Sequence, residues 1–214
     1  LGYEVVVPAH VESGRASLSK GLVRRAKAFA EENVRLLSPV ISAGEPLIGI
    51  EPSAILGFRD EYPALVDPSW REAASKLAPH CLMLDEFISN EVDAGRIDST
   101  IFTREPRVIH VHGHCHQKAL VGTGPTVAVL RWAGFEVSEV DSGCCGMAGS
   151  FGFEREHYDL SVWLGNRRLA PAVRAAPPDT EIVAPGMSCR QQIAHLTGRR
   201  ARHPAEVLRS VLTR

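Results

Sequence analysis

Asp141-Ser142-Gly143-Cys144-Cys145-Gly146 is the stretch around which the chain is organised. Two adjacent cysteines lie between glycines, directly after an apolar run that is typical of a β-strand. Neighbouring cysteines rarely bond to each other, because a disulfide demands separations and dihedral angles that adjacent residues seldom reach. Glycine lets the backbone adopt positive φ and approach another group closely. The pattern favours two thiolates presented to one metal centre, and the alternative is two small buried apolar residues.

Strand-like and helix-like segments alternate on both sides of this stretch. The expected strands are residues 2–7, 47–50, 107–112, 135–137 and 181–184. The expected helices, several with a 3.6-residue apolar period, are residues 18–40, a segment from 54, and 70–79, 82–94, 118–133, 154–175, 190–197 and 205–212. This alternation predicts an α/β fold with a mainly parallel sheet.

The two halves of the chain resemble each other. A shift of 132 positions places Gly2-Tyr3-Glu4-Val5 on Gly134-Phe135-Glu136-Val137 and Gly14 on Gly146. Such a long period indicates a duplication. We therefore expect two pseudo-repeated subdomains, residues 1–100 and 101–214, each with a small mainly parallel sheet flanked by helices. The polar, turn-like residues 97–105 form the boundary.

The cysteines of interest all belong to the second copy. Cys144 and Cys145 align with Glu12 and Ser13, and a further three-residue offset aligns Cys189 with Ala54. The position equivalent to Cys115 would lie ahead of Leu1. The first copy is thus expected to be a degenerate, N-terminally truncated repeat without thiols.

Four cysteines follow predicted strands. They are Cys115, Cys144, Cys145 and Cys189. The loops after parallel strands gather at the carboxyl edge of the sheet, where open α/β sheets bind ligands. Four converging thiolates suit a [4Fe–4S] cluster or a structural zinc. The long gaps between them differ from short zinc-ribbon and ferredoxin spacings, which favours iron–sulfur and makes zinc the alternative.

Polar residues beside the cysteines are candidates for contact with the bound group. His110, His112, His114 and His116 alternate around Cys115, so on an extended segment they would share one face. We single out His114 and His116 as near-site residues that tune the cofactor; the alternative is that they are partly exposed or cap the next helix. Gly146 begins a glycine-rich loop whose N–H groups would wrap the metal site. Arg190 would neutralise the cluster or dock a partner, or it is a surface arginine.

Other signals restrict the class of protein. The 214 residues carry a net charge of −1, so nothing indicates nucleic-acid binding. No apolar run is long enough to span a membrane, and no signal peptide is visible. Five cysteines form an odd, sparse set, which favours a reducing compartment, and Cys81 is expected to be a buried structural cysteine. No constellation of catalytic residues stands out.

Three motifs together are specific enough to indicate a family. They are His112-Gly113-His114-Cys115-His116-Gln117-Lys118, Ser142-Gly143-Cys144-Cys145-Gly146-Met147-Ala148-Gly149-Ser150-Phe151-Gly152 and Gly186-Met187-Ser188-Cys189-Arg190. Through them the chain resembles the cysteine-rich CCG domain family, which occurs in heterodisulfide reductase and in the iron–sulfur subunits of glycolate oxidase and anaerobic glycerol-3-phosphate dehydrogenase. Its likeness is strongest to the carboxyl-terminal part of fused FAD-linked iron–sulfur oxidoreductases of the D-lactate or D-2-hydroxyglutarate dehydrogenase type.

The resemblance implies an electron-transfer portion of a flavin-linked 2-hydroxy-acid dehydrogenase, acting on lactate, glycolate, 2-hydroxyglutarate or a similar acid. FAD would lie on a domain or subunit outside this chain, and electrons would pass to a quinone, a cytochrome or a ferredoxin-like acceptor. Cys115, Cys144, Cys145 and Cys189 would ligate one [4Fe–4S] cluster. Gly186 occupies a place where the family often has cysteine, which argues against a five-cysteine cluster.

The first copy also departs from the family, because Glu12, Ser13 and Ala54 stand where cysteines are usual, so no second cluster is expected there. The isolated chain is not expected to oxidise substrate by itself. One alternative is a zinc-stabilised or metal-free docking scaffold within the same oxidoreductase, and another is thiol–disulfide chemistry at Cys144 and Cys145. The expected location is cytoplasmic, with peripheral attachment at the inner membrane as an option.

Overall fold

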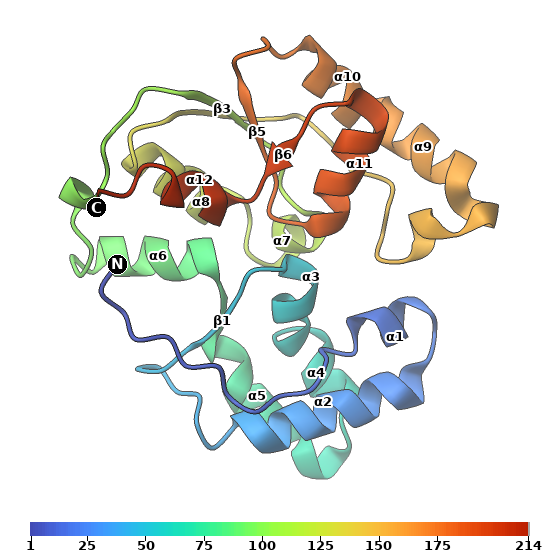
Figure 1. Cartoon of the computed structure of the whole chain (residues 1–214). Coiled ribbons are helices and arrows are strands. Elements are labelled where there is room, and N and C mark those ends of the chain that lie inside the picture. The colour runs from blue at the N-terminus through green and yellow to red at the C-terminus, as the bar shows by residue number, and fades with distance from the viewer. Residues whose placement is uncertain (214) are drawn as a thin grey trace. The chain divides into compact units, whose positions relative to one another are not determined.

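The computed structural model describes residues 1–213 and divides the chain into two compact units, Leu1–Leu84 (unit 1) and Asp85–Arg214 (unit 2). Each unit contains one small parallel sheet with helices packed around it (Figure 1). The predicted α/β class is therefore confirmed. No helix among the described residues is both long enough and apolar enough to cross a membrane.

Unit 1 is mostly helical around a two-stranded sheet in which β1 pairs in parallel with β2. Its helices bury one apolar stripe each, as the 3.6-residue period predicts for Ala26, Ala30 and Val34. Its elements are α1 (Arg15–Ser19), α2 (Val23–Leu37), β1 (Leu47–Gly49), α3 (Pro52–Ile55), α4 (Glu61–Leu65), α5 (Arg71–Leu77) and β2 (Cys81–Met83), with 3-10 helices at Leu56–Phe58, Pro68–Trp70 and Ala78–His80.

The buried strand predicted over residues 2–7 is wrong. This segment has no regular secondary structure, and Val5, Val6 and Val7 are 84%, 72% and 79% exposed. The apolar, β-branched sequence has the composition of a strand. Within residues 1–213, however, no strand pairs with it, so the valines have no neighbour against which to pack.

The loop that aligns with the cysteine pair is held in unit 1 by hydrogen bonds. Asn33 Nδ2 donates to the Glu12 carbonyl at 3.0 Å, and Asn33 Oδ1 accepts from the Val11 N–H at 3.0 Å. The Tyr62 hydroxyl donates to the Ser13 carbonyl at 3.0 Å and is itself 1% exposed as a residue. Buried amide and phenol groups are stable only when they find such partners. This loop is therefore shaped without any sulfur.

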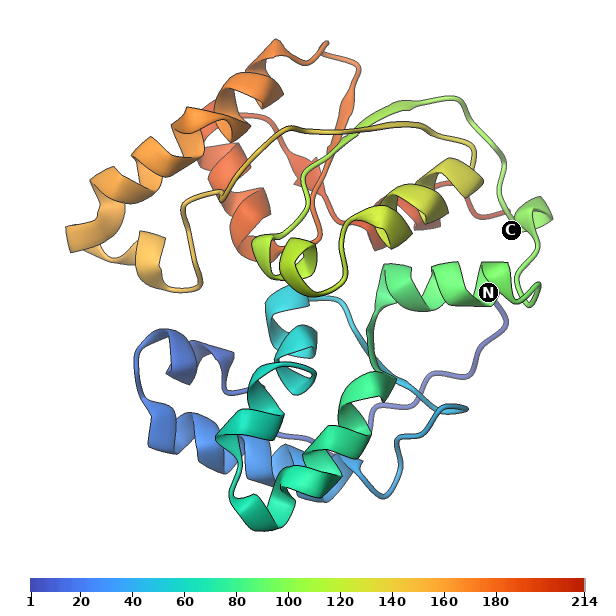
Figure 2. The ribbon, with the colours of Figure 1, turned by 180° about the vertical axis from the view of Figure 1, so that it is seen from behind.

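Unit 2 is built on a four-stranded parallel sheet of order β4-β3-β5-β6. Figure 2 shows α9, α10 and α11 grouped on one side of this sheet, with α8 and α12 on the other. Its elements are α6 (Leu84–Asp93), β3 (Val108–Val111), α7 (Cys115–Leu120), α8 (Gly124–Trp132), β4 (Glu136–Glu139), α9 (Tyr158–Arg167), α10 (Leu169–Ala175), β5 (Glu181–Val183), α11 (Met187–Thr197), β6 (Ala201–Arg202) and α12 (Pro204–Arg209), with 3-10 helices at Ser99–Ile101, Phe151–Phe153 and Arg155–His157.

The sheet's register places its central strands deep in the core. Ile109 of β3 pairs with Val137 of β4 and with Glu181 of β5, and Val111 pairs with Glu139 and Val183. Ile109 and Val111 are 0% exposed. Central strands of parallel sheets are covered on both faces, so they read as continuous apolar runs.

Two further predictions need correction, and one strand was missed. Cys81 is buried as expected, but it lies in β2 and not in a helix. The single helix predicted over residues 154–175 is divided into α9 and α10 at Arg168, whose φ of −142° is not helical. The strand β6 was not predicted, because two residues are too few to show an alternating pattern.

Gly146 fixes the path of the backbone just after the cysteine pair. Its φ is +96°, which side-chain-bearing residues rarely adopt. A Cβ at this position would also overlap the carbonyl oxygen of Ser161 in α9. The cysteine loop and α9 therefore pack at a separation that only glycine permits.

We expect Gly146→Ala to lower the free energy of unfolding by about 3 kcal/mol, because strain at positive φ and the overlap with Ser161 add together. Gly143→Ala is the matched control, since a Cβ there meets no atom within 4 Å. Urea denaturation should show a change below about 0.5 kcal/mol for the control. Equal effects of the two variants would contradict this account of the loop.

Candidate metal centre

The four candidate cysteines come from three loops at one edge of the unit 2 sheet. Because β3, β4 and β5 run in parallel, the segments that follow them emerge on the same side. Cys115 opens α7 after β3, Cys144 and Cys145 lie in the loop after β4, and Cys189 lies in the first turn of α11 after β5. The convergence expected from the sequence is present in the fold.

The sulfurs form a chain of contacts from Cys115 through Cys144 and Cys145 to Cys189. The side chain of Cys144 is hydrogen-bonded to those of Cys115 and Cys145, and the Sγ atoms of Cys145 and Cys189 lie 3.6 Å apart. The N–H of Gly146 donates to Cys144 Sγ at 3.3 Å. The glycine-rich loop thus directs at least one backbone N–H at a sulfur, as expected from the sequence.

The four thiols do not hold their protons equally. Hydrogen bonds with Cys115 and Cys145 lower the pKa of Cys144, and a hydrogen bond with Cys145 lowers the pKa of Cys189, with help from His112. The pKa values of Cys115 and Cys145 are raised, mainly by their hydrogen bonds with Cys144 and, for Cys145, also by burial. Cys144 and Cys189 are therefore the two cysteines whose surroundings favour the thiolate.

His112 is buried beside the cysteine sulfurs, and the sequence analysis did not single it out. Its ring is 1% exposed, and Nδ1 lies 2.5 Å from Ser142 Oγ. Nε2 is buried, and the His112 ring lies beside Cys189, whose pKa it helps to lower. The alternation along β3 places His110 and His112 on one face, but only burial separates the two.

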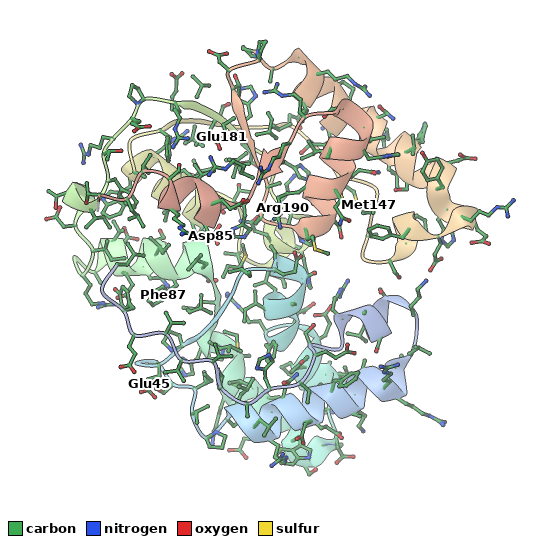
Figure 3. The ribbon with its side chains drawn as sticks, viewed as in Figure 1. Glu45, Asp85, Phe87, Met147, Glu181 and Arg190 are labelled. Atoms are coloured by element: carbon green, nitrogen blue, oxygen red, sulfur yellow. The ribbon has the colours of Figure 1, made fainter. Side chains whose placement is uncertain are left out.

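A line of buried hydrogen bonds positions the turn that carries Cys115. The His114 N–H donates to Gln117 Oε1 at 3.2 Å, and Gln117 Nε2 donates to Thr126 Oγ1 at 2.7 Å. The Thr126 hydroxyl donates in turn to the carboxylate of Asp85 at the start of α6. Asp85 is labelled in Figure 3. Burial raises the pKa of its carboxyl group.

His114 and His116, the two histidines singled out from the sequence, lie at the start of α7. His114 caps α7, because its Nδ1 accepts the His116 N–H at 3.1 Å. The helix begins at Cys115, so the extended alternation ends there and His116 does not continue the face of His112 and His114. The prediction that His116 shares one face with His112 and His114 is therefore wrong, because the capping box at the start of α7 turns the backbone.

Arg190 and Lys118 support the loops of the site. The guanidinium of Arg190 donates to the carbonyls of Ala184 and Pro185 at 3.0 and 2.6 Å and so braces the turn between β5 and α11 (Figure 3). Lys118 Nζ donates to the Ser142 carbonyl at 2.6 Å, which places a positive charge beside the loop of the cysteine pair. Both cations thus hold backbone carbonyls of loops that carry the cysteines.

No protein-family model matches the chain, and no solved structure matches it significantly. It is 28% identical over 210 residues to the D-2-hydroxyglutarate dehydrogenase of Pantoea ananatis and 25% identical over 214 residues to that of Escherichia coli K12. These alignments cover 97% and 99% of this chain but 20% of each relative. The chain thus spans about a fifth of their length.

A second kind of relative is one of the subunits of the anaerobic glycerol-3-phosphate dehydrogenase of Escherichia coli K12. It is 27% identical over 199 residues, which cover 91% of this chain and 48% of that relative. Both kinds of relative are dehydrogenases or parts of them by name, which agrees with the oxidoreductase resemblance noted from the motifs.

The first test of the site concerns Asp85. Because its folded-state pKa is raised above 3.8, the folded protein holds this proton more tightly than the unfolded chain does. Stability is therefore full below about pH 4 and is lost as pH rises through the folded-state pKa. We expect Asp85→Asn to become progressively more stable than the wild type above about pH 4 in urea denaturation. Asp93→Asn, exposed on the same helix, should show no such divergence.

A second test uses alkylation of the reduced, metal-free protein. Brief treatment with iodoacetamide near neutral pH should label Cys144 first, because its pKa is lowered and it is half-buried, whereas Cys81, Cys145 and Cys189 are buried. Tandem mass spectrometry would locate the label. Cys115→Ala should slow labelling of Cys144 more than Cys115→Ser, because serine keeps a hydrogen-bond donor. Faster labelling of Cys115 than of Cys144 would contradict the lowered pKa of Cys144 and the raised pKa of Cys115.

Proposed function

We propose that this chain is an electron-transfer domain in which Cys115, Cys144, Cys145 and Cys189 hold one [4Fe–4S] cluster. The observation that carries the proposal is the meeting of these four sulfurs, from three loops, at the carboxyl edge of one parallel sheet. Four cysteine thiolates are the usual ligands of such a cluster. Bound there, the cluster would accept and release single electrons.

The four sulfurs do not form a ready-made tetrahedral zinc site. Tetrahedral zinc with Zn–S bonds of about 2.3 Å needs all four sulfurs about 3.8 Å apart. Cys145 and Cys189 have that spacing at 3.6 Å. Among residues 1–213, however, no three of these sulfurs lie within 4.8 Å of one another. The preference for iron–sulfur over zinc therefore rests on the long sequence gaps between the cysteines, which differ from those of zinc ribbons.

The surrounding residues supply what an anionic sulfur cluster requires. The buried Nε2 of His112 and the N–H of Gly146 are directed toward the sulfurs. The cations Lys118 and Arg190 hold the two flanking loops through backbone carbonyls. Hydrogen bonds and positive charge around cluster sulfurs raise the reduction potential. His114 would contribute mainly by capping α7, and His116 would lie at the edge of the site.

The relatives suggest the setting in which this domain would work. They are named D-2-hydroxyglutarate dehydrogenases, and this chain aligns with 20% of their length. We place the oxidation of a 2-hydroxy acid by FAD on a portion outside this chain. Electrons would then pass through the cysteine site to an acceptor of the quinone, cytochrome or ferredoxin type. Membership of the CCG domain family, a location in the cytoplasm and a repeat divided at residues 100 and 101 belong to the same proposal.

Anaerobic purification tests the cluster directly. We expect about four irons and four acid-labile sulfides per chain, with broad visible absorbance that bleaches on reduction. Cys144→Ser should lose most of the iron and the absorbance. Cys81→Ser is the matched control, because Cys81 is buried in unit 1 with a pKa raised to about 12, and it should keep both.

The same measurements test the alternative of a docking scaffold. A colourless anaerobic protein with about one zinc per chain would favour a structural zinc at Cys145 and Cys189. A protein with neither metal, whose Cys144→Ser variant binds its flavin partner as tightly as the wild type does, would favour a metal-free scaffold. Either result would refute the electron-transfer proposal.

A further inference from the structure

The segment of residues 4–7 in unit 1 is extended, apolar and exposed. Val5, Val6 and Val7 are each more than two-thirds exposed, at 84%, 72% and 79%. Within residues 1–213, no backbone N–H or carbonyl of residues 4–7 takes part in a backbone hydrogen bond. An unpaired apolar strand is a template for pairing with another strand, and proteins seldom leave one uncovered.

The sheet of unit 1 is also incomplete at β1. β1 pairs with β2 and with no other strand in the described part of the chain. Parallel sheets are almost always covered on both faces, and a pair of three-residue strands is marginal alone. Unit 1 therefore has two backbone segments that lack a partner, residues 4–7 and the free edge of β1.

Unit 2 indicates which strand could pair with both residues 4–7 and β1. There β5 and β6 are parallel neighbours, β6 runs directly into α12, and β4 leads to the positive-φ Gly146. In unit 1, β1 and β2 are parallel neighbours, β2 runs directly into α6, and residues 4–7 lead to Gly14, whose φ is +73°. In unit 2 a further strand, β3, lies between β4 and β5. Within Leu1–Leu84, all of which the structure describes, β2 is the only strand that pairs with β1.

We propose that residues 4–7 and β1 flank the position of a missing central strand, and that polypeptide preceding Leu1 supplies it. In unit 2, β3 precedes β4 in the chain and is separated from it by α7 and α8, so the same order places the missing strand ahead of Leu1. The relatives are about five times as long as this chain. The strand would be parallel to β1 and rich in β-branched residues, as Val108-Ile109-His110-Val111 is.

The pairing of unit 2 also predicts which valine becomes buried. Val5 aligns with Val137, which is 6% exposed in β4, whereas Val6 aligns with Ser138, which is exposed. Completion of the sheet should therefore cover Val5 and leave Val6 at the surface. The missing strand belongs to unit 1 alone, so its absence or presence does not depend on whether the cysteine site of unit 2 binds a metal.

Hydrogen exchange compares residues 1–214 with the natural polypeptide extended ahead of Leu1. In the longer protein, exchange should slow on the order of 100-fold relative to residues 1–214 at those amides of residues 5–7 and 47–49 that point toward the added strand, and not at the amides of β1 that already bond β2. Unchanged exchange in the longer protein would overturn the proposal. If the amides were protected in residues 1–214 only at concentrations that give a dimer in sedimentation, a second copy would supply the strand, and the assignment to the preceding polypeptide would be refuted.

A matched pair of variants provides a second readout. In the longer protein, Val5→Asp should lower the Tm by about 5 °C, and Val6→Asp should change it by less than about 1 °C. In residues 1–214 neither change should lower the Tm, because both side chains are exposed. Equal effects of the two variants in the longer protein would contradict the proposed strand register.

Discussion

The parallel hydrogen-bond ladder of unit 2 is the constraint on which the candidate site depends. It continues one step beyond the strands, because the Val140 N–H donates to the Val111 carbonyl at 2.9 Å and the His112 N–H donates to the Val183 carbonyl at 2.8 Å. These bonds tie together the starts of the three loops that carry the cysteines. Ligands so far apart in sequence can meet only if the strands before them are held in fixed register.

Buried polar side chains then fix each loop. His112 and Ser142 connect the end of β3 to the loop after β4, and Gln117 and Thr126 connect the start of α7 to Asp85. Each group loses water on burial and is stable only with a partner. The remaining ring nitrogen of His112, Nε2, is buried beside Cys189. A polar framework of paired side chains therefore positions the loops, and one histidine of that framework faces the sulfurs.

The two units differ in the residues of one loop, which follows residues 2–7 in unit 1 and β4 in unit 2. Unit 2 places Cys144 and Cys145 there, and unit 1 places Glu12 and Ser13, which Asn33 and Tyr62 hold by hydrogen bonds. The backbone turn is similar, since Gly14 and Gly146 both have positive φ. A loop of one shape can therefore be stabilised by an amide and a phenol in one unit and be available to a metal in the other.

The sequence by itself determined the α/β class, the central strands β3 and β5, and the four cysteines that follow strands, because apolar runs and turn residues are local signals. It misjudged residues 2–7 and missed β6, and it placed Cys81 in a helix, since strand formation depends on a partner that no local pattern reveals. Only the tertiary structure decided that His112 rather than His116 lies buried beside the sulfurs. Burial and pairing are set by residues distant in the chain, whereas periodicity reports only on near neighbours.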